Sequence, residues 1–161
     1  MKIGVMSDSH DNLPLIRRAL ERFEAEGVEC LIHAGDFVAP FAVKEILKFK
    51  GAAHGCFGNN DGEKAGIRKL WPAVAYPPCE LRLGGRRILL THDEASLARV
   101  PELLRRAEVV IVGHTHKPEI RTDAGRGLLR LNPGECGGWV TGKGTVAILD
   151  TDTLSARILE L

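Results

Sequence analysis

Short apolar runs, rich in β-branched residues, alternate with amphipathic stretches through the first part of the chain. The predicted strands cover residues 2–7, 29–33 and 52–56, and the predicted helices cover 13–26, 40–50 and 63–70. The first of these helices is expected because Leu13, Ile16, Leu20 and Phe23 recur at three- and four-residue steps. Strand–helix units in sequence predict parallel pairing of the strands with right-handed crossovers, which is typical of the α/β class.

The pattern changes after residue 72, where prolines interrupt the chain. A β-hairpin is expected over residues 79–83 and 86–91 around Gly84-Gly85, and a helix over 96–106 with a break at Pro101. A buried strand over 109–112 and an antiparallel remainder follow. The expected strands of this remainder are 119–123, 127–132, 144–150 and 154–159. We interpret the change as two halves of one fold, a single domain over residues 1–161.

The composition excludes several classes of function. Among 161 residues, 44% are hydrophobic and 27% charged, and the net charge of +1 gives no strong field toward nucleic acid or anionic lipid. No apolar run approaches the roughly 20 residues of a membrane span. The four cysteines form no C-x-x-C pair, which argues against a zinc ribbon or a disulfide framework, although one disulfide stays open. Because the N-terminus lacks a signal-peptide pattern, we expect a cytoplasmic protein.

The strand expected over 109–112 is followed, past a glycine, by His114 and His116. If the chain stays extended there, side chains two residues apart point the same way, and both imidazoles leave the strand toward one point. An isolated pair of this kind is more often two exposed loop histidines. Asp8 and His10 shift the balance, because they repeat the same spacing directly after a buried strand.

Other polar residues, Asp36, Asn59 and His92, also lie where predicted strands end. Open α/β sheets bind ligands at that edge. The full candidate set is Asp8, His10, Asp36, Asn59, His92, His114 and His116. Carboxylate, imidazole and amide groups suit intermediate divalent ions, and the absence of a thiolate argues against a structural zinc site. The set is too large for one ion and right for two if one carboxylate bridges them, and Asp36 is the natural bridge.

These motifs carry a family resemblance. They stand in the order Asp8-x-His10, Gly35-Asp36, Gly58-Asn59, His92 and Gly113-His114-Thr115-His116. The series resembles the calcineurin-like metallophosphoesterase superfamily. The short length and the segments 31–36, 58–61 and 132–134 are similar to its small prokaryotic phosphodiesterases. The resemblance covers nearly the whole chain and implies an α/β fold of metallophosphoesterase type, a four-layered α/β/β/α sandwich of two mixed sheets.

The resemblance also implies a dinuclear metal site. It places Asp8, His10 and His116 on one ion, Asn59, His92 and His114 on the other, and Asp36 between them. Manganese is the expected metal, with nickel, iron, zinc and magnesium as alternatives. Two ions about 3.5–4 Å apart can hold a bridging hydroxide and clamp a phosphoryl oxygen. We therefore expect a hydrolase acting on a small phosphate diester, with Asp36 and Asn60 as its catalytic candidates.

Several positions depart from the superfamily pattern. Asn60 stands where many members have a histidine, and an amide can donate a hydrogen bond to a phosphoryl oxygen but cannot deliver a proton. This favours activated leaving groups, or a water or metal as the acid. Asp93-Glu94 replace a common glycine, and Glu135-Cys136 replace a common serine. The pair Asp93-Glu94 either points away from the site or restricts the substrate.

Other residues and functions stay open at this point. His33 and His54 are interpreted as core or orienting histidines rather than ligands, and Asp61 as a turn or orienting residue rather than a general acid. The runner-up function is a phosphomonoesterase. A non-catalytic protein-binding scaffold, as in the retromer subunit that resembles this family, is less favoured because every ligand position is retained. A nuclease lacks support without a basic stripe, and a homo-oligomer stays open.

Overall fold

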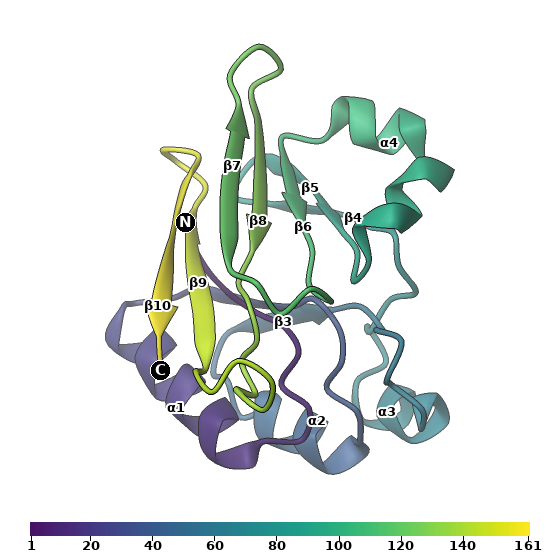
Figure 1. Ribbon diagram of the computed structural model, residues 1–161, viewed down its shortest axis with the longest axis vertical. Helices are drawn as coiled ribbons and strands as arrows, with labels where there is room; N and C mark the ends of the chain where they lie inside the picture. The colour runs from purple at the N-terminus through teal and green to yellow at the C-terminus, as the bar shows by residue number, and fades with distance from the viewer.

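The first of two sheets is built around the N-terminal strand. In the computed structural model, which describes residues 1–161, this sheet has the strand order β10-β9-β1-β2-β3 (Figure 1). Its strands are β1 (Lys2–Met6), β2 (Cys30–His33), β3 (Ala52–Gly55), β9 (Thr145–Asp150) and β10 (Ser155–Glu160). Strands β1, β2 and β3 run parallel, as predicted, and β9 pairs antiparallel with β1.

The second sheet has the order β4-β5-β6-β8-β7. Its strands are β4 (Cys79–Leu83), β5 (Arg86–Leu90), β6 (Val109–Ile111), β7 (Glu119–Asp123) and β8 (Leu128–Asn132). The expectation of an antiparallel remainder is wrong for β8, which pairs parallel with β6. Its apolar residues are buried whereas β7 is exposed throughout, so β8 takes the interior place and β7 the edge.

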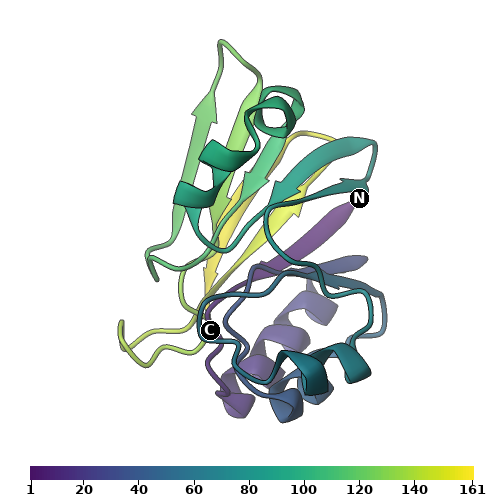
Figure 2. The ribbon, with the colours of Figure 1, turned by 90° about the vertical axis from the view of Figure 1, so that its right-hand side faces the viewer.

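Helices cover the outer face of each sheet. They are α1 (Leu13–Ala25), α2 (Pro40–Ile46) and α3 (Lys64–Leu70) on the first sheet, and the 3₁₀ helix η1 (Glu94–Arg99) with α4 (Pro101–Arg106) on the second. Figure 2 shows α1, α2 and α3 gathered beneath the first sheet. The predicted four-layered α/β/β/α sandwich of two mixed sheets is thus confirmed. None of the helices combines the length and apolar character needed to cross a bilayer.

Side chains of β1 alternate between the two buried clusters on either side of the first sheet. Ile3 and Val5 belong to the buried cluster between the two sheets, whereas Met6 belongs to the cluster under the helices. This is the period of two expected for a strand buried on both faces. At Gly4, a Cβ atom would lie 2.9 Å from the ring of Phe23, so the glycine lets α1 pack directly on the strand.

One helix prediction is corrected, and the break expected at Pro101 is found. The helix expected over 40–50 ends at Ile46, because the N–H groups of Lys48 and Phe49 turn to carbonyls three residues back and tighten the chain. The helix expected over 96–106 is two elements, η1 and α4, which separate before Pro101. A proline has no N–H to continue the ladder and is tolerated only in the first turn of a helix.

Candidate metal centre

The polar residues that follow five strands meet where the carboxyl ends of the two sheets come together. Asp8 and His10 follow β1, Asp36 follows β2, Asn59 follows β3, His92 follows β5, and His114 and His116 follow β6. All of these predicted ligands are linked by contacts of 4.0 Å or less between their polar atoms. The structure therefore brings the whole candidate set together, and metal binding by it stays a prediction.

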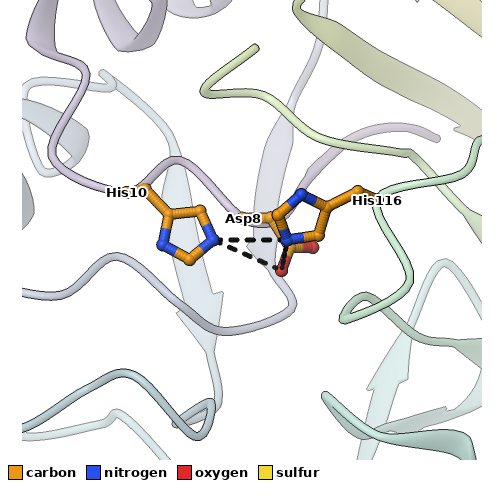
Figure 3. A group of neighbouring side chains, drawn as sticks. All are labelled: Asp8, His10 and His116. Atoms are coloured by element: carbon orange, nitrogen blue, oxygen red, sulfur yellow. Dashed lines mark hydrogen bonds and ion pairs between the residues drawn. The ribbon is translucent and has the colours of Figure 1, made fainter. Parts of the chain in front are cut away.

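One group consists of Asp8, His10 and His116, whose side chains point toward one another in Figure 3. His116 Nε2 lies 3.4 Å from Asp8 Oδ1 and 3.4 Å from His10 Nε2. Asp8 is fully buried, and the two imidazoles are partly exposed. The three ligand atoms lie within 4.8 Å of one another, which is close enough to hold one ion.

A second group surrounds the amide of Asn59. Its Oδ1 lies 3.0 Å from His92 Nε2 and 3.0 Å from His114 Nδ1. The Nδ1 atom of His92 faces the carbonyl of Ala34 at 2.8 Å, so that nitrogen donates and Nε2 keeps its lone pair toward the site. A histidine whose other nitrogen is held in this way is oriented to bind a metal.

Asp36 lies between the two groups. Its Oδ2 is 3.8 Å from His10 Nε2 and 3.3 Å from His92 Nε2. Burial alone raises the pKa of Asp36, but the interaction with the neighbouring His92 imidazole and the hydrogen bonds from Asn60 outweigh burial and hold that pKa well below its ordinary value. Asp36 is therefore an ionised carboxylate that contacts a histidine of each group, and its role as a bridge stays a prediction.

The backbone at the site is unusual. Positive φ angles occur at Asp8 (51°), His10 (41°), Asp36 (60°), His114 (70°) and His116 (61°). Non-glycine residues hold this conformation only where surrounding contacts impose it, and it clusters at functional sites.

The expectation of an extended chain at His114 and His116 is wrong. The N–H of His114 donates to Asp8 Oδ2 at 3.0 Å, which bends the chain after β6. As a result the two histidines face different groups rather than one point. Gly113 permits this approach, because a Cβ atom there would lie 2.0 Å from Ser7 Oγ.

Orphaned buried atoms test whether a cation fits. Asp8 Oδ1 and His116 Nδ1 are buried without a hydrogen-bond partner. Burial raises the pKa of Asp8, since no positive group fully compensates its charge. A buried, unsatisfied polar atom is costly, and a cation contacting Asp8 Oδ1 would remove that cost. The oxygen and nitrogen donors of both groups thus fit divalent ions.

Asn60, the other catalytic candidate, is engaged with Asp36. Its backbone N–H donates to Asp36 Oδ1 at 2.8 Å, and its side-chain Nδ2 donates to Asp36 Oδ2 at 2.7 Å. One of the two amide hydrogens is therefore used inside the site. The predicted hydrogen bond from the other amide hydrogen to a phosphoryl oxygen stays a prediction.

Asp61 and His33 hold the loops around Asp36. Buried Asp61 accepts hydrogen bonds from the N–H groups of Asp36, Val38 and Gly58, in agreement with its interpretation as a turn or orienting residue. Buried His33 accepts from the N–H of Gly35 through Nδ1, and its Nε2 contacts the Ser9 hydroxyl at 3.0 Å, so its orienting role agrees with the interpretation from sequence. His54 lies in β3, outside the contacts among the candidate ligands.

The residues that depart from the family pattern, Asp93, Glu94 and Cys136, make different contacts. Asp93 caps η1 through the N–H of Ala95, and Glu94 pairs with Arg130 and Arg121. Glu94 is thus directed toward β7 and β8 rather than the site. Cys136 is buried, and burial raises the pKa of its thiol, so it serves packing.

Glu135 is the residue whose place sequence reasoning missed. It is fully buried, and its Oε1 lies 3.4 Å from His116 Nδ1. Burial raises the pKa of Glu135, but hydrogen bonds from Val140 and Thr141 outweigh burial and lower it. The replacement of the family's serine by a carboxylate was the available sign.

A cavity of about 280 Å³ opens beside the second group. Three predicted ligands, Asn59, His92 and His114, line one part of it. Lys64 and Arg99 also line it, and neither has a carboxylate within 4.0 Å. The cavity therefore joins the candidate metal centre to two cations without a carboxylate partner, and the acidic residue Asp93 lines it as well.

Comparisons with known proteins show the family to which the chain is similar. The family model described as the calcineurin-like phosphoesterase superfamily domain matches residues 1–154. The chain is 36% identical to phosphodiesterase MJ0936 of Methanocaldococcus jannaschii, covering 100% of this chain and 99% of that protein. It is 30% identical to phosphodiesterase YfcE of Escherichia coli K12, covering 99% and 92%. A solved structure of an archaeal phosphodiesterase superposes with a TM-score of 0.90 at 36% identity, with both chains fully covered.

Proposed function

This chain belongs to the calcineurin-like phosphoesterase superfamily, and from that premise we propose that it is a phosphodiesterase that works with two divalent metal ions. The chain is a phosphoesterase by homology with named phosphodiesterases along its full length. The observation that carries the finer proposal is Asp36, an ionised carboxylate that contacts histidines of both groups.

We assign the ligands to two positions. The first ion would contact Asp8, His10 and His116. The second ion would contact Asn59, His92 and His114. Asp36 would contact both ions. The short contacts within each group and the orphaned Asp8 Oδ1 support this assignment. Manganese suits a set of carboxylate, imidazole and amide donors without thiolate, as do nickel, iron, zinc and magnesium to differing degrees.

The residues divide the catalytic work. Bound divalent ions would supply positive charge at the phosphoryl oxygens and lower the pKa of water, so that a nucleophile is present at neutral pH. Asp36 would hold both ions and offset their mutual repulsion, and the second amide hydrogen of Asn60 can donate to a phosphoryl oxygen. No histidine acid stands at position 60, so a departing group that is a weak base is favoured.

The cavity beside the second group favours a diester over a monoester. It gives one ester arm of the substrate a place next to Asn59 and His92. Phosphomonoester hydrolysis is the second candidate, because the cations Lys64 and Arg99 could neutralise the extra negative charge of a monoester. The substrate is expected to be a small phosphate ester in either case.

Comparing two chromogenic substrates tests the proposal. With manganese bound, kcat/KM for bis(4-nitrophenyl) phosphate is expected to exceed that for 4-nitrophenyl phosphate by about tenfold or more. The opposite order would establish the monoesterase. Asp36→Asn, which keeps the shape but loses the charge, serves as the control and should abolish hydrolysis. No turnover of either substrate with any of the five metals would contradict the proposed function.

Two further points belong to the proposal. We treat residues 1–161 as one domain, because β9 and β10 return from the C-terminal part into the first sheet and share its buried cluster. The four cysteines are free thiols and three of them are buried, which supports a reducing, cytoplasmic setting.

A further inference from the structure

Glu135 lies on the far side of His116 from the candidate metal position. Nε2 of His116 faces Asp8 and His10, while Nδ1, at the other side of the ring, faces Glu135 Oε1 at 3.4 Å. Glu135 is completely buried, and its Oε1 is the carboxylate oxygen that faces His116 Nδ1, a buried atom that makes no hydrogen bond in the structure. The imidazole is therefore held between a candidate ion and a buried carboxylate.

The other contacts of Glu135 come from the loop that follows it. Oε2 accepts from the N–H of Thr141 at 2.9 Å, from the Thr141 hydroxyl at 2.8 Å and from the N–H of Val140 at 3.2 Å. Oε1 accepts from the N–H of Val140 at 3.0 Å. No lysine or arginine lies within 4.0 Å of the carboxylate. The loop thus occupies Oε2 and leaves Oε1 with capacity for one more donor, which His116 Nδ1 can supply.

We propose that Glu135 is a positioning residue that fixes the proton of His116 on Nδ1 and so presents the lone pair of Nε2 to the first ion. A neutral imidazole carries one proton, and only the unprotonated nitrogen can bind a metal. The carbonyl of Ala34 has the same relation to His92. The inference rests on the proposed function, because it takes His116 as a ligand.

The tautomer of His116 in the metal-free protein is the first test. Nitrogen-15 NMR at neutral pH is expected to show the proton of the neutral ring on Nδ1 and none on Nε2. In Glu135→Gln the loop donors retain the amide oxygen, so the NH₂ group turns toward Nδ1 and donates to it. The proton is then expected to move to Nε2. A wild-type ring protonated on Nε2 would overturn the proposal without any variant.

Metal affinity is the second test. Manganese titration should show a first-ion dissociation constant that rises about 10- to 100-fold in Glu135→Gln, the usual effect of losing such an orienting partner. The second ion should change by less than about threefold. Thr141→Val is the matched control: it removes the hydrogen bonds of the hydroxyl with Glu135 and with the backbone of Lys143 but keeps the carboxylate, and it should leave both constants within about threefold of wild type.

The two tests separate the possible failures. Equal manganese affinity in wild type and a folded Glu135→Gln variant would overturn the role of Glu135 alone. If Thr141→Val raised the first-ion dissociation constant by the same factor, the effect would come from the loop, and the proposed role of Glu135 would be overturned as well. Wild-type protein that binds no divalent ion would contradict the proposed function, and the inference would fall with it.

Discussion

His33 shows what burial does to a single titratable side chain. It lies beneath the Asp36 turn, completely buried, and burial lowers the pKa of His33 to about 3. Nδ1 accepts the N–H of Gly35 at 3.2 Å, which requires an unprotonated nitrogen. The native state therefore keeps this imidazole neutral at pH values where the unfolded chain protonates it.

The free energy of unfolding should therefore decrease as the pH is lowered, because His33 is protonated more readily in the unfolded chain. The unfolded pKa is near 6.5 and the folded pKa about 3, so the stability is complete above pH 6.5 and is lost as pH falls toward 3. Between pH 7 and pH 5 the loss is about 2 kcal/mol. His33→Gln offers an acceptor and a donor but does not titrate, so its free energy of unfolding should fall about 2 kcal/mol less. Urea denaturation at both pH values measures the free energy of unfolding. An equal decrease between pH 7 and pH 5 in wild type and in His33→Gln would contradict the prediction.

Asn60 decides which leaving groups the enzyme accepts. Asn60→His should raise kcat/KM for phenyl diesters relative to 4-nitrophenyl diesters, because general-acid catalysis matters most for a basic leaving oxygen and is worth roughly 10²–10⁴-fold. The substitution also removes the side-chain hydrogen bond from Asn60 to Asp36, which affects the hydrolysis of both substrates. Asn60→Gln, which has no acid, controls for that loss and should leave the substrate ratio unchanged. Equal ratios in all three proteins would show that protonation is not the missing contribution.

At the scale of elements, the sequence predicts most of what positions the site. Apolar runs predict the buried strands. Because β1, β2 and β3 pair in parallel, the residues that follow them lie at one edge of the sheet. Local pattern could not predict the positive φ angles at His114 and His116, since they depend on a hydrogen bond to Asp8, more than a hundred residues away. The contact of Glu135 with His116 depends on packing in the same way.

Asp61 joins two of these loops. Its Oδ2 accepts the N–H groups of Asp36 and Gly58 at 3.1 and 2.7 Å, and its Oδ1 accepts that of Val38 at 2.7 Å. A carboxylate can serve all three donors, whereas an asparagine offers one oxygen and turns its NH₂ group toward the rest. The β2–α2 loop and the loop after β3 are therefore tied through one side chain.

Asp61→Asn should consequently lower the free energy of unfolding by about 1–3 kcal/mol, the cost of a buried donor left unsatisfied. Metal affinity at Asp36 should fall with it. Asp93→Asn is the matched control, because exposed Asp93 accepts a single N–H from Ala95 and its loss should cost less than about 1 kcal/mol. Denaturant unfolding compares the two variants, and equal costs would show that Asp61 does not tie the loops.

At the scale of the whole molecule, the candidate metal centre lies across the junction of the two sheets. The first ion position takes Asp8 and His10 from the first sheet and His116 from the second. The second position takes Asn59 from the first sheet, and His92 and His114 from the second. Both ions would therefore connect the sheets in addition to activating water.

Metal binding should for this reason stabilise the whole fold. Manganese at about 1,000 times its dissociation constant adds roughly 4 kcal/mol per independent site, which for a chain of this length raises Tm by about 8–16 °C. Thermal unfolding with manganese, and again after chelation with EDTA, measures the shift. His116→Ala should keep about half of it, because one ion remains, and Asp36→Asn should lose nearly all, because both ions depend on that carboxylate. Elemental analysis should then find about one ion per chain in the first variant and none in the second. A full shift in Asp36→Asn would mean that the ions do not share this residue, and the two-ion assignment would be wrong.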